Sequence, residues 1–364
     1  MGATRALITG AGISAHPPVS LPLGGEFGDR ILRFCYASAA RVAPGAVDQH
    51  GLSRVAAIPR NLLPRLAASA GVHSVEALLE CFRVSVPAEA HLLAAVHGVR
   101  GTLHVTFNFD DGVEQAYALL AGAADLPAYA PAEYRAALWE WQQAVRPDAP
   151  LMVASSGLAD VDYDHRPLLV KLRGSVGAGF DPGLLCEQPT SPDGDQPVFS
   201  REQLTAVVAA ARSAHVVVAG VSGADIDCRQ ELIPLLTRGR FTWTASELSA
   251  GIAASLGAID PSQPVLRPAL DGLRRSLPEG TTLPAWPRID IAAPHFDDRF
   301  AAWQAQFPVE AAAEAYASLL CGAGLAAQAL PILHQLLARH DHPRTRGLLS
   351  TAATTARHDR DRAG

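Results

Sequence analysis

Short apolar runs that end at glycine or at polar residues recur along the first 245 residues of the sequence. Such a run is typical of a strand buried on both faces of a parallel sheet. The predicted strands are residues 6–9, 102–106, 151–154, 168–172 and 215–219. Between them, helical spacing of apolar residues predicts helices in residues 26–40, 52–97, 112–120, 131–146 and 203–212, with breaks near Pro59, Pro64 and Pro87. This alternation predicts an α/β fold with a Rossmann-like, mostly parallel sheet covered by helices on both faces.

The pattern changes after about residue 245, where proline-rich linkers separate short pieces. Residues 309–338 have the spacing of a helical pair around Gly322–Gly324, which loosely resembles a tetratricopeptide-type hairpin. A single hairpin cannot bury its own apolar face, so we expect it to pack on the main domain or on a partner. Residues 344–362 are Arg-rich with interspersed Asp, and they are interpreted as a frayed terminus.

These changes predict two regions. Residues 1–245 form the predicted α/β domain, with helical insertions at about 26–97 and 112–147. Residues 246–364 form a linker and a small C-terminal helical region. Inside the first region, residues 177–199 are rich in Gly, Pro and Asp, which predicts a loop.

Charge and composition narrow the range of partners. The net charge is −6 and no Lys/Arg run is present, whereas a nucleic-acid binder needs a concentrated basic face. No charge-free apolar stretch reaches the length of ~20 residues that a membrane span needs, so no membrane association is expected. A homo-oligomer stays possible on these grounds.

The five cysteines are widely spaced and form no C-x-x-C pair, which argues against a zinc site of four cysteines. They are interpreted as small buried apolar residues. The chain starts directly with a strand-like run rather than with a charged and then apolar leader, so a reducing cytoplasm is the expected location.

Polar clusters follow three of the predicted strands, at residues 10–14, 108–111 and 220–225. Ligands of open parallel sheets bind at the carboxyl ends of the strands, so we expect these clusters to form one composite site. Each cluster also has a simpler interpretation. The Gly-x-Gly of the first is common in plain turns, the aspartates of the second commonly cap the following helix, and the third fits a strand-to-helix turn.

Together these motifs resemble the sirtuin superfamily, in particular its bacterial sirtuin-like branch. Gly10–Ser14 is similar to the opening G-A-G-I-S of the family, and residues 106–110 are similar to T-x-N-x-D. Residues 171–175 are similar to K-L-H-G-S, and residues 220–225 to the G-x-S-x-x-D of the bacterial branch. The four motifs occur in the order of the family and cover roughly residues 5–245.

The resemblance implies an NAD site and cleavage of the nicotinamide–ribose bond, often in antiphage defence. It implies that Asn108 positions the attacking water or the ribose and that Asp110 assists, with Arg173 as the third residue of the catalytic group. The implied cofactor-binding residues are Gly10, Ala11, Gly12 and Ser14 at the pyrophosphate, Ser222 and Asp225 near the adenosine, and Thr106, Gly174, Ser175 and Gly220.

Two departures from the family matter. The zinc ribbon is absent, which argues against protein deacetylation and implies no zinc. Arg173 stands where the family has its catalytic histidine, and an arginine cannot serve as a base near neutral pH. Three nearby histidines are weak candidates to replace it and are more simply interpreted as surface or satisfied residues: His16, His104 and His165.

Three functions stay open at this point. The first is an NAD glycohydrolase, because glycosidic cleavage needs no base as strong as deacetylation does. The second is a catalytically silent module that binds NAD or ADP-ribose, which Arg173 favours. The third is transfer of ADP-ribose to a small-molecule acceptor in specialised metabolism. A generic oxidoreductase fits less well, because Ala15 replaces the third glycine of the G-x-G-x-x-G fingerprint.

Overall fold

The computed structural model describes residues 5–56, 62–176, 200–221, 232–245, 250–259, 268–289, 291 and 296–363. The chain divides into two compact units. The sheet unit is Met1–Leu23, Glu80–Phe180 and Pro197–Asp298, and the helical unit is Gly24–Leu79, Asp181–Gln196 and Arg299–Gly364. This division differs from the predicted boundary at residue 245. Residues 246–298 belong to the sheet unit, and residues 24–79 group with the C-terminal helices.

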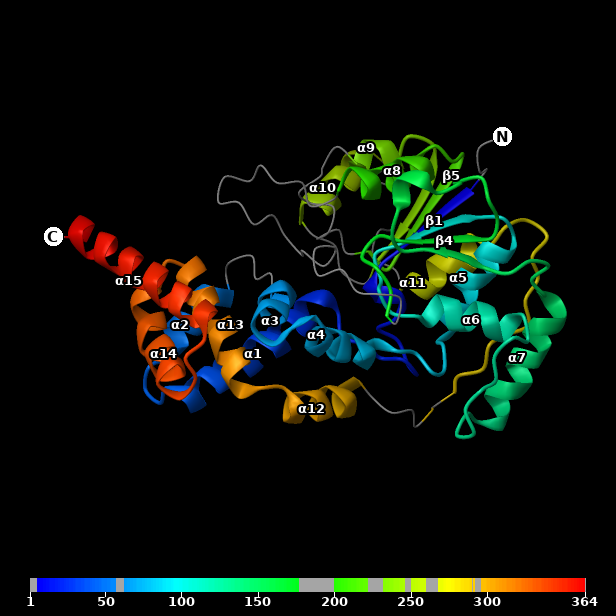
Figure 1. Ribbon diagram of the computed structural model, residues 1–364. Coiled ribbons are helices and arrows are strands. Elements are labelled where there is room, and N and C mark those ends of the chain that lie inside the picture. Colours follow the sequence, from blue (N-terminus) through cyan, green and yellow to red (C-terminus); the bar gives the residue numbers. More distant parts are fainter. Residues whose placement is uncertain are drawn as a thin grey trace. The chain divides into compact units, whose positions relative to one another are not determined.

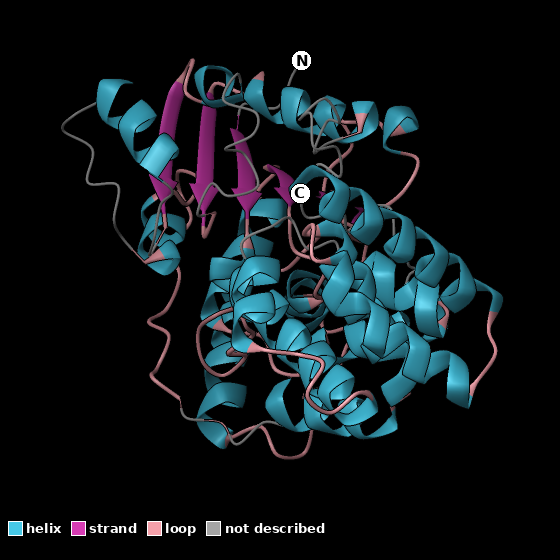
Figure 2. Ribbon diagram, turned by 90° about the vertical axis from the view of Figure 1, so that its left-hand side faces the viewer, coloured by secondary structure: helices cyan, strands magenta, loops and turns pink. Residues whose placement is uncertain are grey.

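The sheet unit contains six parallel strands in the order β3-β4-β2-β1-β5-β6. Figure 2 shows strands of this sheet side by side. The strands are β1 (Arg5–Thr9), β2 (Leu103–Thr106), β3 (Met152–Ala154), β4 (Leu168–Lys171), β5 (His215–Ala219) and β6 (Arg240–Thr244). The α/β fold with a Rossmann-like parallel sheet is therefore confirmed. The pattern missed only β6 among these strands. It lies at the edge of the sheet, where its first three residues are partly exposed, so it carries no continuous apolar run.

Helices cover both faces of this sheet (Figure 1). One face is covered by α5 (Glu89–Val99), α6 (Gly112–Leu120), α7 (Ala132–Ala144) and α11 (Ala269–Arg275). The other face is covered by α8 (Arg201–Ala211), α9 (Leu232–Leu236) and α10 (Ala250–Ile259). Short 3₁₀ turns occur at η1 (Ala11–Ile13), η2 (Glu80–Phe82) and η3 (Leu158–Asp160), and α12 (Phe296–Gln306) spans the boundary of the two units.

Successive residues of β1 point into different cores, which explains the unbroken apolar run. Leu7 packs into the layer under α5 and α6, whereas Ala6 and Ile8 pack into the layer under α8. Side chains alternate across a strand, so a strand covered on both faces needs apolar residues at every position.

The described part of the predicted linker, residues 268–289 and Ile291, lies on the core of the sheet unit. Trp286 contacts the rings of Tyr134 and Trp141 at centroid distances of 5.0 and 5.1 Å. The indole of Trp141 donates a hydrogen bond of 3.0 Å to the carbonyl of Pro284. This proline-rich stretch therefore covers α7 rather than acting as a free connection.

The helical unit is built from two separate parts of the chain. Its helices are α1 (Gly24–Val42), α2 (Gln49–Ala56), α3 (Leu62–Ala70), α4 (Val72–Leu79), α13 (Val309–Gly322), α14 (Ala326–Arg339) and α15 (Pro343–Ala363). The predicted helical pair is present as α13 and α14, and α13 packs on α1 and α3. Pro64 does not break α3, because it lies in the first turn, where a missing N–H costs nothing.

The expectation of a frayed C-terminus was wrong. Residues 343–363 form one continuous helix, α15, which packs on α14. The buried carboxylate of Glu314 on α13 accepts a 2.8 Å hydrogen bond from Arg344 and another from the Thr345 hydroxyl. These bonds anchor the first turn of a helix whose composition alone favours disorder.

Candidate functional site

All six strands run parallel, so the ends of β1, β2, β4 and β5 meet at one edge of the sheet. The chain leaves β1 towards β2 through α5 on one face, whereas it leaves β5 towards β6 through α9 on the other face. The neighbours β1 and β5 therefore form the topological switch point, where such sheets bind ligands. Ser222 and Asp225 lie outside the described residues, so their predicted roles stay predictions.

Three glycines allow the loops after β1 and β5 to touch. A Cβ on Gly10 would lie 2.7 Å from Gly220 O, and a Cβ on Gly12 would lie 2.7 Å from Gly220 Cα. The N–H groups of Gly10 and Gly12 donate to Ala219 O and Gly220 O over 3.1 and 3.0 Å. Close packing of one loop on the other therefore explains these glycines without a ligand. The pyrophosphate roles of Gly10, Ala11, Gly12 and Gly220 stay predictions.

We expect Gly220→Ala to lower the free energy of unfolding of the sheet unit by about 3 kcal/mol. Gly220 has a φ of +71°, and a Cβ there would lie 2.7 Å from Ile13 N. The matched control is Gly101→Ala, since Gly101 has a φ of +80° but open space around it. That change should cost only about 1–2 kcal/mol, the backbone strain alone. Hydrogen exchange of the sheet amides measures both, and equal losses would contradict a role for close packing.

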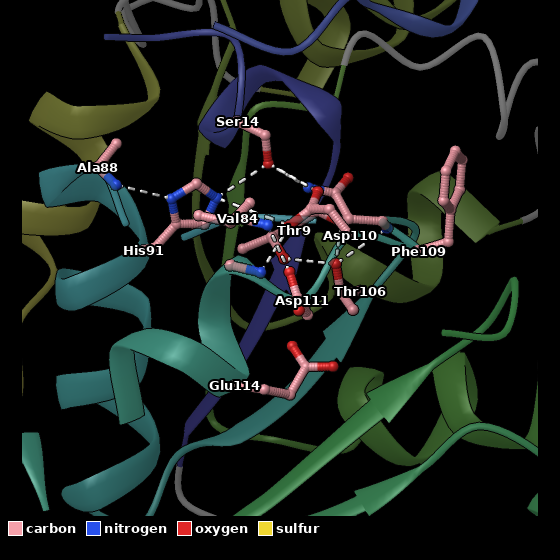
Figure 3. A network of polar contacts seen from close by, with 12 residues as sticks. Thr9, Ser14, Val84, Ala88, His91, Thr106, Phe109, Asp110, Asp111 and Glu114 are labelled. Carbon is pink, nitrogen blue, oxygen red and sulfur yellow. Dashed lines mark hydrogen bonds and ion pairs between the residues drawn. The ribbon is translucent and has the colours of Figure 1, made fainter. Parts of the chain in front are cut away.

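Ser14, Asn108 and Asp110 form one buried polar network, together with a histidine that the motifs did not include. Figure 3 shows Ser14, Asp110 and this histidine, His91. The Ser14 hydroxyl donates to Asp110 Oδ2 over 2.8 Å and accepts from Asn108 Nδ2 over 3.0 Å. His91 Nε2 lies 2.9 Å from Ser14 Oγ and 3.8 Å from Asp110 Oδ1. The structure thus brings together residues from the first two motifs.

His91 lies on α5, inside a stretch predicted only as helical. Burial lowers the pKa of His91; the nearby Asp110 opposes this shift and His16 adds to it. The single sequence signal for this histidine is Gly112, because a Cβ there would lie 2.6 Å from the His91 ring. That signal can be read only once the helices have been placed.

Asp110 caps the start of α6 as the simpler interpretation expected, whereas the side chain of Asp111 makes no capping bond to this helix. Asp110 Oδ1 accepts a hydrogen bond of 2.9 Å from the N–H of Gly112, so this carboxylate both caps α6 and takes part in the polar network. Asp111 Oδ1 accepts the N–H of Val84 over 2.7 Å, and burial raises the pKa of Asp111. Asp111 therefore ties the loop before α5 to the end of β2.

Thr106 stabilises the backbone of the site through its side-chain hydroxyl. Thr9, its register partner on β1, donates to Thr106 Oγ1 over 2.9 Å, and the N–H of Asn108 donates to the same oxygen over 3.1 Å. His104 Nε2 lies 2.8 Å from Thr9 Oγ1, and burial lowers the pKa of His104 to about 3. His104 is thus a satisfied core histidine, and Thr106 fixes the backbone of Asn108.

The other two histidines occupy different positions. His165 is exposed and precedes β4, so it lies at the amino edge of the sheet, opposite the network. His16 follows Ser14 by two residues, is partly exposed, and is near enough to affect His91 electrostatically.

The motif after β4 is tied to the same edge by Lys171. Its buried ammonium donates to Asp110 O and Glu114 Oε1, each over 2.5 Å, and to Ser175 Oγ over 2.9 Å. Gly174 makes the turn with a φ of +77°, which favours glycine. Arg173, between them, is only 9% exposed. The predicted ligand contacts of Arg173, Gly174 and Ser175 stay predictions.

Comparisons with protein-family models, curated proteins and solved structures found no match. Within the part of the chain that the structure describes, no three His, Cys, Asp or Glu side chains are grouped as metal ligands. In the same residues, no helix has the length and apolar character of a membrane span.

Proposed function

We propose that the sheet unit binds NAD at the carboxyl edge of its strands and cleaves the nicotinamide–ribose bond, as the resemblance to sirtuin-like proteins implies. The observation that carries this proposal is the Ser14–Asn108–Asp110 network, which joins residues of two resembling motifs in one buried place. The glycine loop adds little support, since the N–H groups of Gly10 and Gly12 bond to carbonyls of the protein itself.

The network suits the chemistry of glycosidic cleavage. The bond breaks through a positively charged, oxocarbenium-like centre, which a preorganised carboxylate stabilises. Asp110 accepts one hydrogen bond at each carboxylate oxygen, from the Ser14 hydroxyl and from the N–H of Gly112. The carboxylate is therefore already held in place before the charge develops. The side-chain amide of Asn108 bonds to the same Ser14 hydroxyl and can orient a water or a ribose hydroxyl. Nicotinamide leaves with the electron pair of the broken C–N bond, water adds to the ribose carbon, and the proton that the water loses passes to solvent.

Arg173 favours a second candidate, a module that binds NAD or ADP-ribose without cleaving it. It follows β4 at the same edge, is largely buried, and cannot act as a base. Its planar guanidinium suits a phosphate or carboxylate. Transfer of ADP-ribose to a small acceptor is a variant of the first proposal, in which the acceptor replaces water.

The deciding experiment is nicotinamide release from NAD by the full chain, compared with Asn108→Ala. We expect the variant to lose at least about 100-fold in turnover, as for a misplaced reacting group. Gln142→Ala is the control, because this amide on α7 donates to Leu119 O on α6, outside the network. Unchanged turnover in Asn108→Ala would refute the site. Saturable NAD binding without release would favour the binding module, and Arg173→His would then test whether a base restores cleavage.

A further inference from the structure

A completely buried histidine completes the site. His91 has 0% exposed surface and contacts Ser14, the residue to which both Asn108 and Asp110 bond (Figure 3). A buried imidazole must have its polar atoms satisfied, so the directions of its hydrogen bonds can be derived from its partners.

The backbone determines which nitrogen of His91 carries the proton. The N–H of Ala88 donates to His91 Nδ1 over 3.2 Å. A backbone amide can only donate, so Nδ1 holds a lone pair and the proton of the neutral ring is on Nε2. Nε2–H then donates to Ser14 Oγ over 2.9 Å.

This donor sets the direction of the other bonds at Ser14. The Asp110 carboxylate can only accept, so the one proton of the hydroxyl goes to Oδ2 and the hydroxyl must accept from both the His91 ring and the Asn108 amide. Asn108 must therefore turn its NH₂ group towards Ser14. Its carbonyl oxygen is left facing away, and no donor among the described residues bonds to it.

We propose that His91 is a positioning residue of the site: it locks the Ser14 hydroxyl, so that Asn108 presents a carbonyl oxygen to the substrate. That oxygen accepts a hydrogen bond from a water or a ribose hydroxyl, the two O–H groups that glycosidic cleavage brings to the site. The effect on turnover rests on the proposed NAD cleavage, whereas the directions of the hydrogen bonds do not.

The same directions exclude Ser14 as a nucleophile of the Ser-His-Asp type. In such a triad the serine donates to the histidine, and the other ring nitrogen donates to a carboxylate. Here the serine donates to Asp110, and His91 Nδ1 accepts from the backbone. The Ser14 side chain then serves the Asn108–Asp110 network and not the pyrophosphate contact that the resemblance implies.

The first test is the tautomer of His91 in the wild-type chain. The protein is labelled with ¹⁵N-histidine, and the ring of His91 is assigned through its proximity to the amides of Ala88 and Gly112. We expect one protonated nitrogen, Nε2, at neutral pH and without ligand. A proton on Nδ1, or on both nitrogens, would overturn the inference. This test does not depend on NAD turnover or on the folding of a variant.

The second test separates positioning from folding. We expect His91→Phe to lower kcat about 100-fold with a much smaller change in KM, since misplaced groups cost rates of this order. His91→Gln retains an N–H donor towards Ser14 and should recover part of kcat. His97→Phe is the matched control, because His97 is equally buried on α5 but contacts Leu273 O instead of the network.

The outcomes distinguish the two proposals. If the wild type releases nicotinamide and His91→Phe behaves like His97→Phe, the positioning role is wrong while NAD cleavage stands. If the wild type releases none, NAD cleavage fails, and the tautomer measurement alone decides the direction of the hydrogen bonds.

Discussion

We expect Lys171→Met to destabilise the sheet unit by about 3–5 kcal/mol, the usual cost of breaking a buried ion pair from one side. Lys171 is the only lysine in a sequence that otherwise uses arginine. Its ammonium has 0% exposed surface and bonds to Glu114, whose side chain is 20% exposed. Burial raises the pKa of Glu114, and Lys171 opposes that shift. Methionine fills the space but leaves the carboxylate without its cation.

The geometry explains why this position carries lysine. Carbonyl, carboxylate and hydroxyl oxygens of Asp110, Glu114 and Ser175 converge on one nitrogen. A compact ammonium can donate to all three, whereas the planar fork of a guanidinium spreads its donors. Lys171→Arg keeps the charge, and we expect it to destabilise the unit as well.

Hydrogen exchange of the β2 and β4 amides measures these changes in the sheet unit alone. Arg274→Met is the control, because Arg274 pairs with Glu89 but is 47% exposed. An exposed pair contributes about 1 kcal/mol or less. The double change Lys171→Met with Glu114→Leu should recover much of the loss, since it removes both charges. A single change no costlier than the control would contradict a stabilising role of the buried Lys171–Glu114 pair.

The parts of the fold that sequence could predict are those covered on both sides. Residues 6–9 and 215–219 are apolar at every position because cores lie on both faces of the sheet. β6 at the edge and the Arg-rich α15 each bury few side chains, so their patterns carry less information. Composition also changes at residue 245 although the chain returns to the sheet, since proline marks local conformation and not distant packing.

The candidate site divides in the same way. Ser14, Asn108 and Asp110 follow strand ends, and the parallel topology brings such ends together, so their motifs could be found from sequence. His91 reaches them from a helix, by packing that no local pattern records. The motifs could also not give directions of hydrogen bonds, which depend on the neighbouring N–H of Ala88.

The stability of the sheet unit should fall steeply with acid because two core histidines stay neutral in the folded chain. Burial lowers the pKa of His97 to about 4 and of His104 to about 3, from 6.5 in the unfolded chain. Above pH 6.5 both states are neutral and nothing is lost; below it the unfolded chain binds protons that the folded chain does not. Each histidine then costs about 2 kcal/mol at about pH 5. Buried carboxylates with raised pKa, such as Glu114, act in the opposite direction.

A single substitution tests the contribution of His104 to this pH dependence. His104→Leu loses the bond to Thr9, so at neutral pH we expect it to be less stable than the wild type by about 1 kcal/mol. At about pH 5 it no longer carries the penalty of about 2 kcal/mol, so it should be the more stable chain. The control Val105→Ala removes buried methyl groups from the same strand and should shift stability equally at both pH values. Hydrogen exchange of β1 and β2 across this range measures the crossover. Parallel curves for wild type and His104→Leu would show that His104 does not stay neutral in the fold.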